Sequence, residues 1–147
     1  WLDDDVLVAG EVGVAVVRRD HPRVKSRLTK ALFNAEPQVD VLIALGQGGQ
    51  GRSGIEKVFR AAGLERRVVI SVSSFTAAAL IASKTDYVAC LPRRVARTLA
   101  PMLGLRILPL PIPEAKLGVG LVWHERTNAS VERRYFRDQV LALLREE

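Results

Sequence analysis

Two adjacent serines stand where a predicted strand gives way to a predicted helix, and they are the best-placed ligand-binding groups in the chain. Ser73 and Ser74 follow the β-branched run VVISV at residues 68–72, and the alanine-rich segment FTAAALIAS follows them. The free amides and partial positive charge of a helix N-terminus suit a carboxylate or a phosphate. The alternative is that Ser74 is only a helix cap, which is a common use of serine.

A glycine-rich loop is a second candidate for chemistry. The sequence GQGGQG at residues 46–51 matches G-x-G-x-x-G between a predicted strand and a predicted helix, where a dinucleotide-binding loop would lie. Two features argue against a dinucleotide. Ser53 and Glu56 form a capping box that starts the helix after the third glycine, and the next strand ends in serines instead of an acidic residue. No Walker A lysine follows either, so we expect a flexible rim to a crevice.

The remaining reactive side chains predict no catalytic or metal centre. His124 has neither a nucleophile nor a metal-ligand partner at telling spacing, and His21 before a proline reads as a turn residue. Cys90 is the only cysteine and lies in an apolar run, so it is expected to be a small buried side chain. We therefore predict that the chain is not an enzyme and has no cofactor, disulfide or metal.

The elements that position the two serines form a strand, helix, strand, helix pattern. Residues 67–73 predict a strand buried on both faces, 75–83 a helix, 87–91 a second strand, and Pro92 the first residue of a helix that runs to 103. This βαβα order indicates a parallel sheet, whose ligand crevice lies at the carboxyl ends of its strands.

Elements before and after this unit extend the α/β pattern. Strands are predicted at 11–19, 39–45, 105–110 and 116–124, a short helix at 29–35, a helix through 55–62 that Gly63 ends, and a linker at 108–113. The last helix, 129–147, is expected to bury five side chains and expose its charges: Tyr135, Phe136, Val140, Leu143 and Leu144.

Composition indicates a globular chain with one core or two small lobes. It has 147 residues, of which 48% are hydrophobic, and no apolar run long enough to cross a bilayer. The net charge is +6, but the 22 lysines and arginines are scattered and lack interleaved aromatic residues, so we expect a solvated basic surface. The start WLDDD lacks signal-peptide features, which predicts a cytoplasmic chain, and a first residue other than Met suggests a start inside a longer protein.

Six segments in order resemble a known family. They are VRRDHP at 17–22, RRVVISVSSF at 66–75, TDYVACLPRRVA at 85–96, LRILPLPIP at 105–113, LVWHER at 121–126 and YFRDQV at 135–140. Together they resemble the effector-binding domain of LysR-type transcriptional regulators, over nearly the whole chain from Glu11. The sequence departs from the family at Tyr87, where glycine or leucine is usual, and at Tyr135 and Phe136, where Trp-Leu is frequent.

The resemblance implies an α/β fold of the type II periplasmic-binding-protein class. Two Rossmann-like lobes would be joined by crossover strands and would hold a small inducer, with the N-terminal part of one lobe missing from this chain. Residues 1–21 would form a proximal-lobe strand and crossover, 22–113 the distal lobe, and 114–147 the second crossover strand and closing helix. The implied function is the ligand-sensing domain of a bacterial regulator that binds DNA through a helix-turn-helix absent from these residues.

From these patterns we expect an organic acid or similar inducer to bind at eight residues: Gly46, Gln47, Gly48, Ser73, Ser74, Phe75, Thr76 and Pro92. The full-length protein is expected to form a homo-oligomer, a dimer or tetramer, through the helix around Ile55, Val58 and Phe59, and to lack any membrane partner. Two alternatives stay open at this point: a periplasmic-type solute-binding protein for a small organic acid, and a small α/β enzyme.

Overall fold

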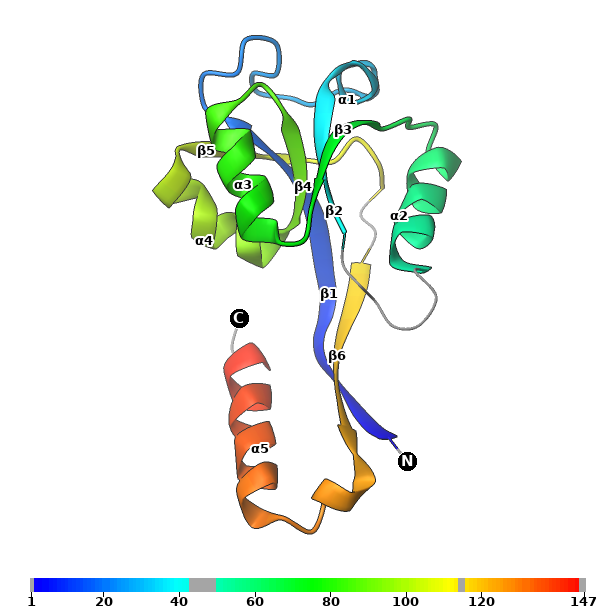
Figure 1. Ribbon diagram of the computed structural model, residues 1–147, viewed down its shortest axis with the longest axis vertical. Helices are drawn as coiled ribbons and strands as arrows, with labels where there is room; N and C mark the ends of the chain where they lie inside the picture. The colour runs from blue at the N-terminus through cyan, green and yellow to red at the C-terminus, as the bar shows by residue number, and fades with distance from the viewer. Residues whose placement is uncertain (1, 43–49, 114–115, 146–147) are drawn as a thin grey trace. The chain divides into compact units, whose positions relative to one another are not determined.

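The computed structural model describes residues 2–42, 50–113 and 116–145, which form strands and helices in the predicted alternation (Figure 1). In chain order the elements are β1 (Leu2–Arg18), α1 (Lys30–Ala35), β2 (Pro37–Val41), α2 (Gln50–Ala61), β3 (Arg67–Val72), α3 (Phe75–Lys84), β4 (Val88–Pro92), α4 (Arg93–Leu103), β5 (Leu105–Pro109), β6 (Lys116–His124), the 3-10 turn η1 (Glu125–Thr127) and α5 (Val131–Arg145).

The chain divides into two compact units. One contains residues 12–115, and the other contains residues 1–11 together with 116–147. The sequence had placed these divisions at 21/22 and 113/114, so the larger unit begins ten residues earlier than the predicted distal lobe, inside strand β1. The linker predicted at 108–113 is confirmed for residues 110–113, which carry no regular structure, whereas Leu108 and Pro109 belong to β5.

The larger unit is built on a mixed sheet with strand order β3-β2-β4-β1-β5. Strand β2 runs parallel to both β3 and β4, whereas β1 pairs antiparallel with β4 and β5. The predicted βαβ pattern is therefore confirmed, since α2 connects β2 to β3 and α3 connects β3 to β4. Parallel strands carry their carboxyl ends to one edge of a sheet, and that edge holds the candidate site.

Helices lie on both faces of this sheet (Figure 1). The side chains of β1 alternate between two cores. Val14 and Val16 belong to the core that includes residues of α3 and α4, and Ala15 and Val17 to the core that includes residues of α1 and α2. The second core includes Phe33 of α1 against Phe59 of α2, with ring centroids 5.3 Å apart, together with Leu64, Val88 and Leu108.

Strand β3 does not have the predicted burial. It lies at the sheet edge with β2 as its neighbour, and Val69 and Ile70 are 46% and 40% exposed. The run VVISV has the β-branched composition of a central strand. Composition alone does not tell whether a strand has a neighbour on both sides or, like β3, on one side only. The prediction of burial on both faces was wrong for β3 and is met by β2, whose Val39 is 1% exposed.

Helix ends follow the predicted signals with two exceptions. Gly63 after α2 and Gly104 after α4 adopt φ of 74° and 63°, the left-handed conformation that glycine accepts readily. Pro92 closes β4 and caps α4, so it stands one residue outside the helix that it was predicted to begin. Helix α2 begins at Gln50, so the third glycine, Gly51, lies inside it and the proposed start at a Ser53 cap was wrong.

The smaller unit consists of the start of β1, strand β6 paired with it, η1 and α5. The predicted burial on α5 was wrong: Tyr135, Phe136 and Leu143 are 65%, 68% and 69% exposed, and Val140 and Leu144 are half-buried. Helical spacing of apolar residues identifies an apolar face but not what covers it. Among the described residues, no helix is long and apolar enough to span a membrane.

Candidate functional site

The carboxyl ends of three parallel strands meet at one edge of the larger sheet. Val41 of β2 pairs with Val72 of β3, and the next amide, that of Leu42, donates to the Val72 carbonyl at 2.8 Å. On the other side of β2, strand β4 ends at Pro92. Because β3 and β4 both flank β2, their ends lie about 10 Å apart, two strand spacings. An edge of this width suits a small organic molecule.

Ser74 caps α3 in the manner that the sequence indicated. Its backbone is extended, with φ −144° and ψ 148°, and its hydroxyl oxygen accepts the Ala77 amide at 3.1 Å. The capping role is therefore confirmed. A hydroxyl that accepts one bond keeps its own O–H as a donor, so capping does not use up the group.

The other predicted residues on this edge differ in exposure. Ser73 and Thr76 are exposed, whereas Phe75 is half-buried and packs partly against the core beneath α3 and α4. Pro92 is also half-buried. The structure thus brings four consecutive residues, 73–76, to the start of α3, with Pro92 two strands away. The predicted contributions of Gly46, Gln47 and Gly48 lie outside the described residues.

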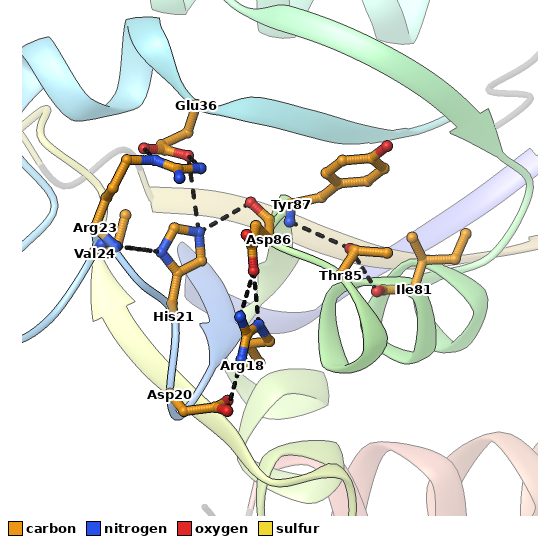
Figure 2. A network of polar contacts seen from close by, with 10 residues as sticks. All are labelled: Arg18, Asp20, His21, Arg23, Val24, Glu36, Ile81, Thr85, Asp86 and Tyr87. Atoms are coloured by element: carbon orange, nitrogen blue, oxygen red, sulfur yellow. Dashed lines mark hydrogen bonds and ion pairs between the residues drawn. The ribbon is translucent and has the colours of Figure 1, made fainter.

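A buried polar network lies at the opposite, amino edge of the same strands, and the sequence did not predict it (Figure 2). Its centre is His21, which is fully buried. The Nδ1 atom accepts the amides of Val24 at 2.9 Å and Arg23 at 3.2 Å. Since Nδ1 accepts, the ring proton is on Nε2, which donates to the Asp86 carbonyl at 2.9 Å. His21 lies in a turn as predicted, and its ring in addition bonds the backbone of Arg23, Val24 and Asp86.

Ion pairs surround this histidine and join separate segments of the chain. Arg23 donates from Nε and Nη2 of its guanidinium to the two carboxylate oxygens of Glu36, at 2.6 Å and 2.7 Å. Arg18, at the end of β1, pairs with Asp86 at 2.6 Å and with Asp20 at 2.6 Å, and its hydrogen bond holds the pKa of the Asp20 carboxyl below its ordinary value. The network ties the end of β1 to the residues that immediately precede β2 and β4, so we assign it a structural role.

A second buried charge cluster lies between α2 and the sheet. The side chain of Arg66 is 4% exposed, pairs with Asp40 at 2.8 Å and with Glu56 at 3.1 Å, and lies over the Phe59 ring at 5.4 Å. Cys90 lies near this cluster, and burial raises the pKa of its thiol from 9.0 to about 11. The side chain of Cys90 is half-buried, so the prediction of a small buried side chain is met only in part.

The remaining histidine is local in its contacts. His124 caps the 3-10 turn by accepting the Arg126 amide at 3.2 Å, which confirms a structural role. Nearby, Arg137 lies 4.8 Å above the Trp123 ring, and the indole donates to Asn128 at 2.8 Å. Within the described residues, no group of three potential metal ligands is present.

Of the three apolar side chains predicted to form an exposed surface on α2, Phe59 is only 4% exposed and belongs to the core. Val58 is 48% exposed, as predicted, and the side chain of Ile55 is not among those described. Phe59 is buried because it packs in the same core as Phe33 and Leu64. Other exposed apolar side chains of this unit include Val69 and Ile70 of β3, Leu80 of α3 and Met102 of α4.

A family model and several curated proteins match this chain. The family model described as "LysR substrate binding domain" matches residues 7–145. The regulator SyrM of Rhizobium meliloti, described as an HTH-type transcriptional regulator, is 32% identical over 128 residues, which cover 86% of this chain and 38% of that protein. The chain thus spans well under half of this curated relative.

Solved structures agree on the fold. A probable transcriptional regulator from Pseudomonas aeruginosa superposes with a TM-score of 0.77 and 26% identity, over 96% of this chain and 44% of that one. The effector-binding domain of QuiR, solved in complex with shikimate, gives a TM-score of 0.66 at 16% identity, over 99% of this chain and 66% of that one.

These relatives are transcriptional regulators, so they do not support the alternative of a periplasmic solute-binding protein. The matched model covers nearly the whole chain, and the α/β sheet with helices on both faces has the fold of solved LysR regulatory domains. The chain therefore belongs to the LysR family of transcriptional regulators, of which it is a substrate-binding domain.

Proposed function

We propose that this domain senses a small organic acid and thereby controls DNA binding by a helix-turn-helix that these residues do not contain. The observation that carries the proposal is the start of α3, where Ser73, Ser74 and Thr76 lie at the carboxyl ends of the parallel strands of the mixed sheet. A structural neighbour, the QuiR domain, was solved with shikimate, which is a carboxylic acid. The shikimate complex of that domain supports a carboxylic acid as the class of ligand.

The chemistry of the edge favours an acid. The first amides of α3 and its partial positive charge attract a carboxylate, and two exposed hydroxyls can hydrogen-bond it. Phe75 is half-buried, so part of its ring is available to an apolar ligand body. No acidic residue stands in the first turn of α3 to compete for this position.

Calorimetric titration with a panel of aromatic and aliphatic carboxylates tests this site. We expect Ser74→Ala and Phe75→Ala to weaken binding of a confirmed ligand by about tenfold each, because each removes a direct contact. Ser83→Ala, in the last turn of the same helix, is the matched control and should leave affinity unchanged. Equal affinity in all three variants would show that the ligand binds elsewhere.

We propose that this domain makes no sequence-specific contact with DNA. Its basic residues are dispersed over both units, so any attraction to DNA is electrostatic and falls steeply with salt. A mobility-shift assay at physiological salt should detect no preference for an operator over scrambled DNA. A clear preference would contradict the assignment of DNA recognition to a separate segment.

We propose further that the full-length protein is a cytoplasmic, non-catalytic homo-oligomer, a dimer or tetramer, with no membrane partner. The exposed aliphatic side chains of β3 and α3 offer an apolar surface that a second copy can bury. Sedimentation of the complete sensor domain should give a dimer that Ile70→Lys or Leu80→Glu weakens more than Val58→Glu. A strictly monomeric species at tens of micromolar would contradict the regulator assembly.

A further inference from the structure

The loop between β1 and α1 carries an excess of positive charge. Residues 18–27 include five lysines and arginines but a single acidic residue, Asp20. Arg106 of β5 joins them, because its guanidinium donates to the Lys25 carbonyl. Residues 18–27 together with Arg106, which we call the basic loop, therefore contain six cations: Arg18, Arg19, Arg23, Lys25, Arg27 and Arg106.

Carboxylates offset half of this charge (Figure 2). Arg18 pairs with Asp20 and with Asp86, each at 2.6 Å. Arg23 pairs with Glu36, also at 2.6 Å. Within the part of the chain that the structure describes, three carboxylates thus face six cations in these pairs. Three positive charges remain in excess, however the individual contacts are shared among the side chains.

The excess charge lies at the surface. Arg19, Lys25 and Arg27 are exposed, whereas the two apolar residues of the loop are Val24, which is buried, and Pro22, which is exposed. Protein–protein interfaces are usually centred on large apolar or aromatic side chains, and the exposed part of this loop presents none. Its surface therefore suits a partner that is recognised by charge.

The backbone of the loop is held in place by bonds to other parts of the larger unit. The Arg19 amide donates to the Gly104 carbonyl at 3.0 Å, and the Val24 amide donates to the ring of the buried His21 at 2.9 Å. The Lys25 carbonyl accepts a bond from Arg106. A loop that is already ordered loses less conformational entropy when a partner binds.

We infer that the basic loop binds the phosphate backbone of duplex DNA without regard to base sequence. Duplex DNA carries a negative charge about every 1.7 Å along its axis, so it can meet several separate cations at once, which a single small anion cannot do. The guanidinium groups of Arg19 and Arg27 can each bind a phosphate through two parallel N–H bonds.

The choice of DNA as the polyanion rests on the proposed function. The matched relatives are described as HTH-type transcriptional regulators, so the complete protein is expected to bind DNA. The inference goes beyond recognition of an operator by the helix-turn-helix, because it adds a contact that carries no sequence information.

Fluorescence anisotropy with a labelled duplex of scrambled sequence measures this contact. We would titrate the duplex with the 147-residue chain at salt concentrations from about 20 to about 150 mM. The expected Kd is in the tens of micromolar at the lowest salt. The slope of log K against log salt should be about −3, because each of three phosphate contacts contributes about −0.9.

Variants of the exposed cations test whether the contact is local. Arg19→Gln/Lys25→Gln/Arg27→Gln should weaken binding at least tenfold at the lowest salt and should make the slope shallower by about 2. Arg19→Lys/Arg27→Lys keeps the charge, so its affinity should stay within about threefold of the wild type. Circular dichroism melts establish that each variant is folded.

The matched control removes the same charge from elsewhere in the larger unit. Arg60→Gln/Arg67→Gln/Lys84→Gln replaces two arginines and one lysine that are exposed on α2, β3 and α3. Both triple variants lower the net charge from +6 to +3. The control should weaken binding less than about threefold, because salt screens charges that lie outside the contact.

Three results would overturn the inference: no salt-dependent binding by the wild-type chain, equal weakening by the two triple variants, or displacement of the duplex by poly-glutamate at a lower concentration of charges than by unlabelled duplex. The last result would indicate an acidic protein partner. Failure of the proposed function is read separately, as a preference for an operator over scrambled DNA at physiological salt, because the slopes above are measured with scrambled DNA alone.

Discussion

The two edges of the parallel strands in the larger unit carry different kinds of polar side chain: paired charges at one edge and hydroxyl groups at the other. At the amino edge, each strand follows a charged residue held in an ion pair: Glu36 before β2, Arg66 before β3 and Asp86 before β4, with partners at 2.6, 2.8 and 2.6 Å. At the carboxyl edge, β3 is followed by the exposed Ser73 and the cap Ser74, and β4 ends at Pro92.

This difference separates stability from binding. Charges at the amino edge are buried or partly buried and are paired within the chain, so removing one leaves its partner without compensation. Hydroxyls at the carboxyl edge face water or cap a helix, and they can exchange these contacts for a ligand at small cost. Substitutions at the amino edge should therefore lower the free energy of unfolding, and those at the carboxyl edge should change affinity.

The largest effect is expected for Arg66→Met. Methionine fills a similar volume but takes the guanidinium away from Asp40 and Glu56, and Asp40 is only 6% exposed at its side chain. Breaking a buried pair by removing one partner typically costs about 3 to 5 kcal/mol. Urea unfolding followed by circular dichroism should report this loss. Arg67→Met, an exposed neighbour on β3, is the control and should change stability by less than about 0.5 kcal/mol.

The reactivity of Cys90 tests the same cluster without a substitution. Burial raises the pKa of the thiol to about 11, so at pH 8 about one thiol in a thousand is ionised, against about one in ten at a pKa of 9.0. Alkylation by iodoacetamide in the folded chain should be at least about a hundredfold slower than in urea. Equal rates would mean that this part of the sheet opens readily.

The raised pKa of the Cys90 thiol also predicts how the stability of the fold depends on pH. Because the folded pKa is raised above the unfolded one, the folded chain keeps a proton that the unfolded chain releases between pH 9 and 11. The stability that this thiol contributes is fully present below pH 9 and is lost as pH rises through 11. Cys90→Ser retains the shape but should flatten this segment of the stability profile.

A somewhat smaller loss is expected for His21→Ala. The substitution leaves two amides without their acceptor and the Asp86 carbonyl without its donor, inside a network that excludes water. About 2 to 3 kcal/mol should be lost, measured by the same urea titration. His124→Ala removes an exposed histidine that caps a short turn, and it should cost less than about 1 kcal/mol. A cost for His21→Ala no larger than that of the control would contradict the structural role of the network.

The contrast between the edges also explains what the sequence could predict. Signals at the carboxyl edge are local, because a β-branched run and a serine cap follow each other directly and a proline ends the next strand. The order of elements and the capping role of Ser74 could therefore be predicted from the sequence. The His21 network joins residues 65 positions apart, and the Arg66 to Asp40 pair spans 26. Spacing along the chain carries no signal for such contacts, so neither cluster was predicted.

Errors in predicted burial have the same origin. Strand β3 and helix α5 were expected to bury apolar side chains that are exposed, because hydrophobic periodicity identifies an apolar face without identifying what covers it.

A smaller loss of stability than for Arg66→Met or His21→Ala is expected for Ser74→Ala, although this substitution should weaken effector binding. The change removes one cap bond, from the Ala77 amide at 3.1 Å, and such losses cost about 1 kcal/mol. Thr76→Ala, exposed and one residue into the helix, should cost less than about 0.5 kcal/mol. Urea midpoints give these values, and calorimetry gives the affinities. If Ser74→Ala destabilised the chain as much as Arg66→Met, the carboxyl edge would be part of the stabilising framework and the separation of roles between the edges would fail.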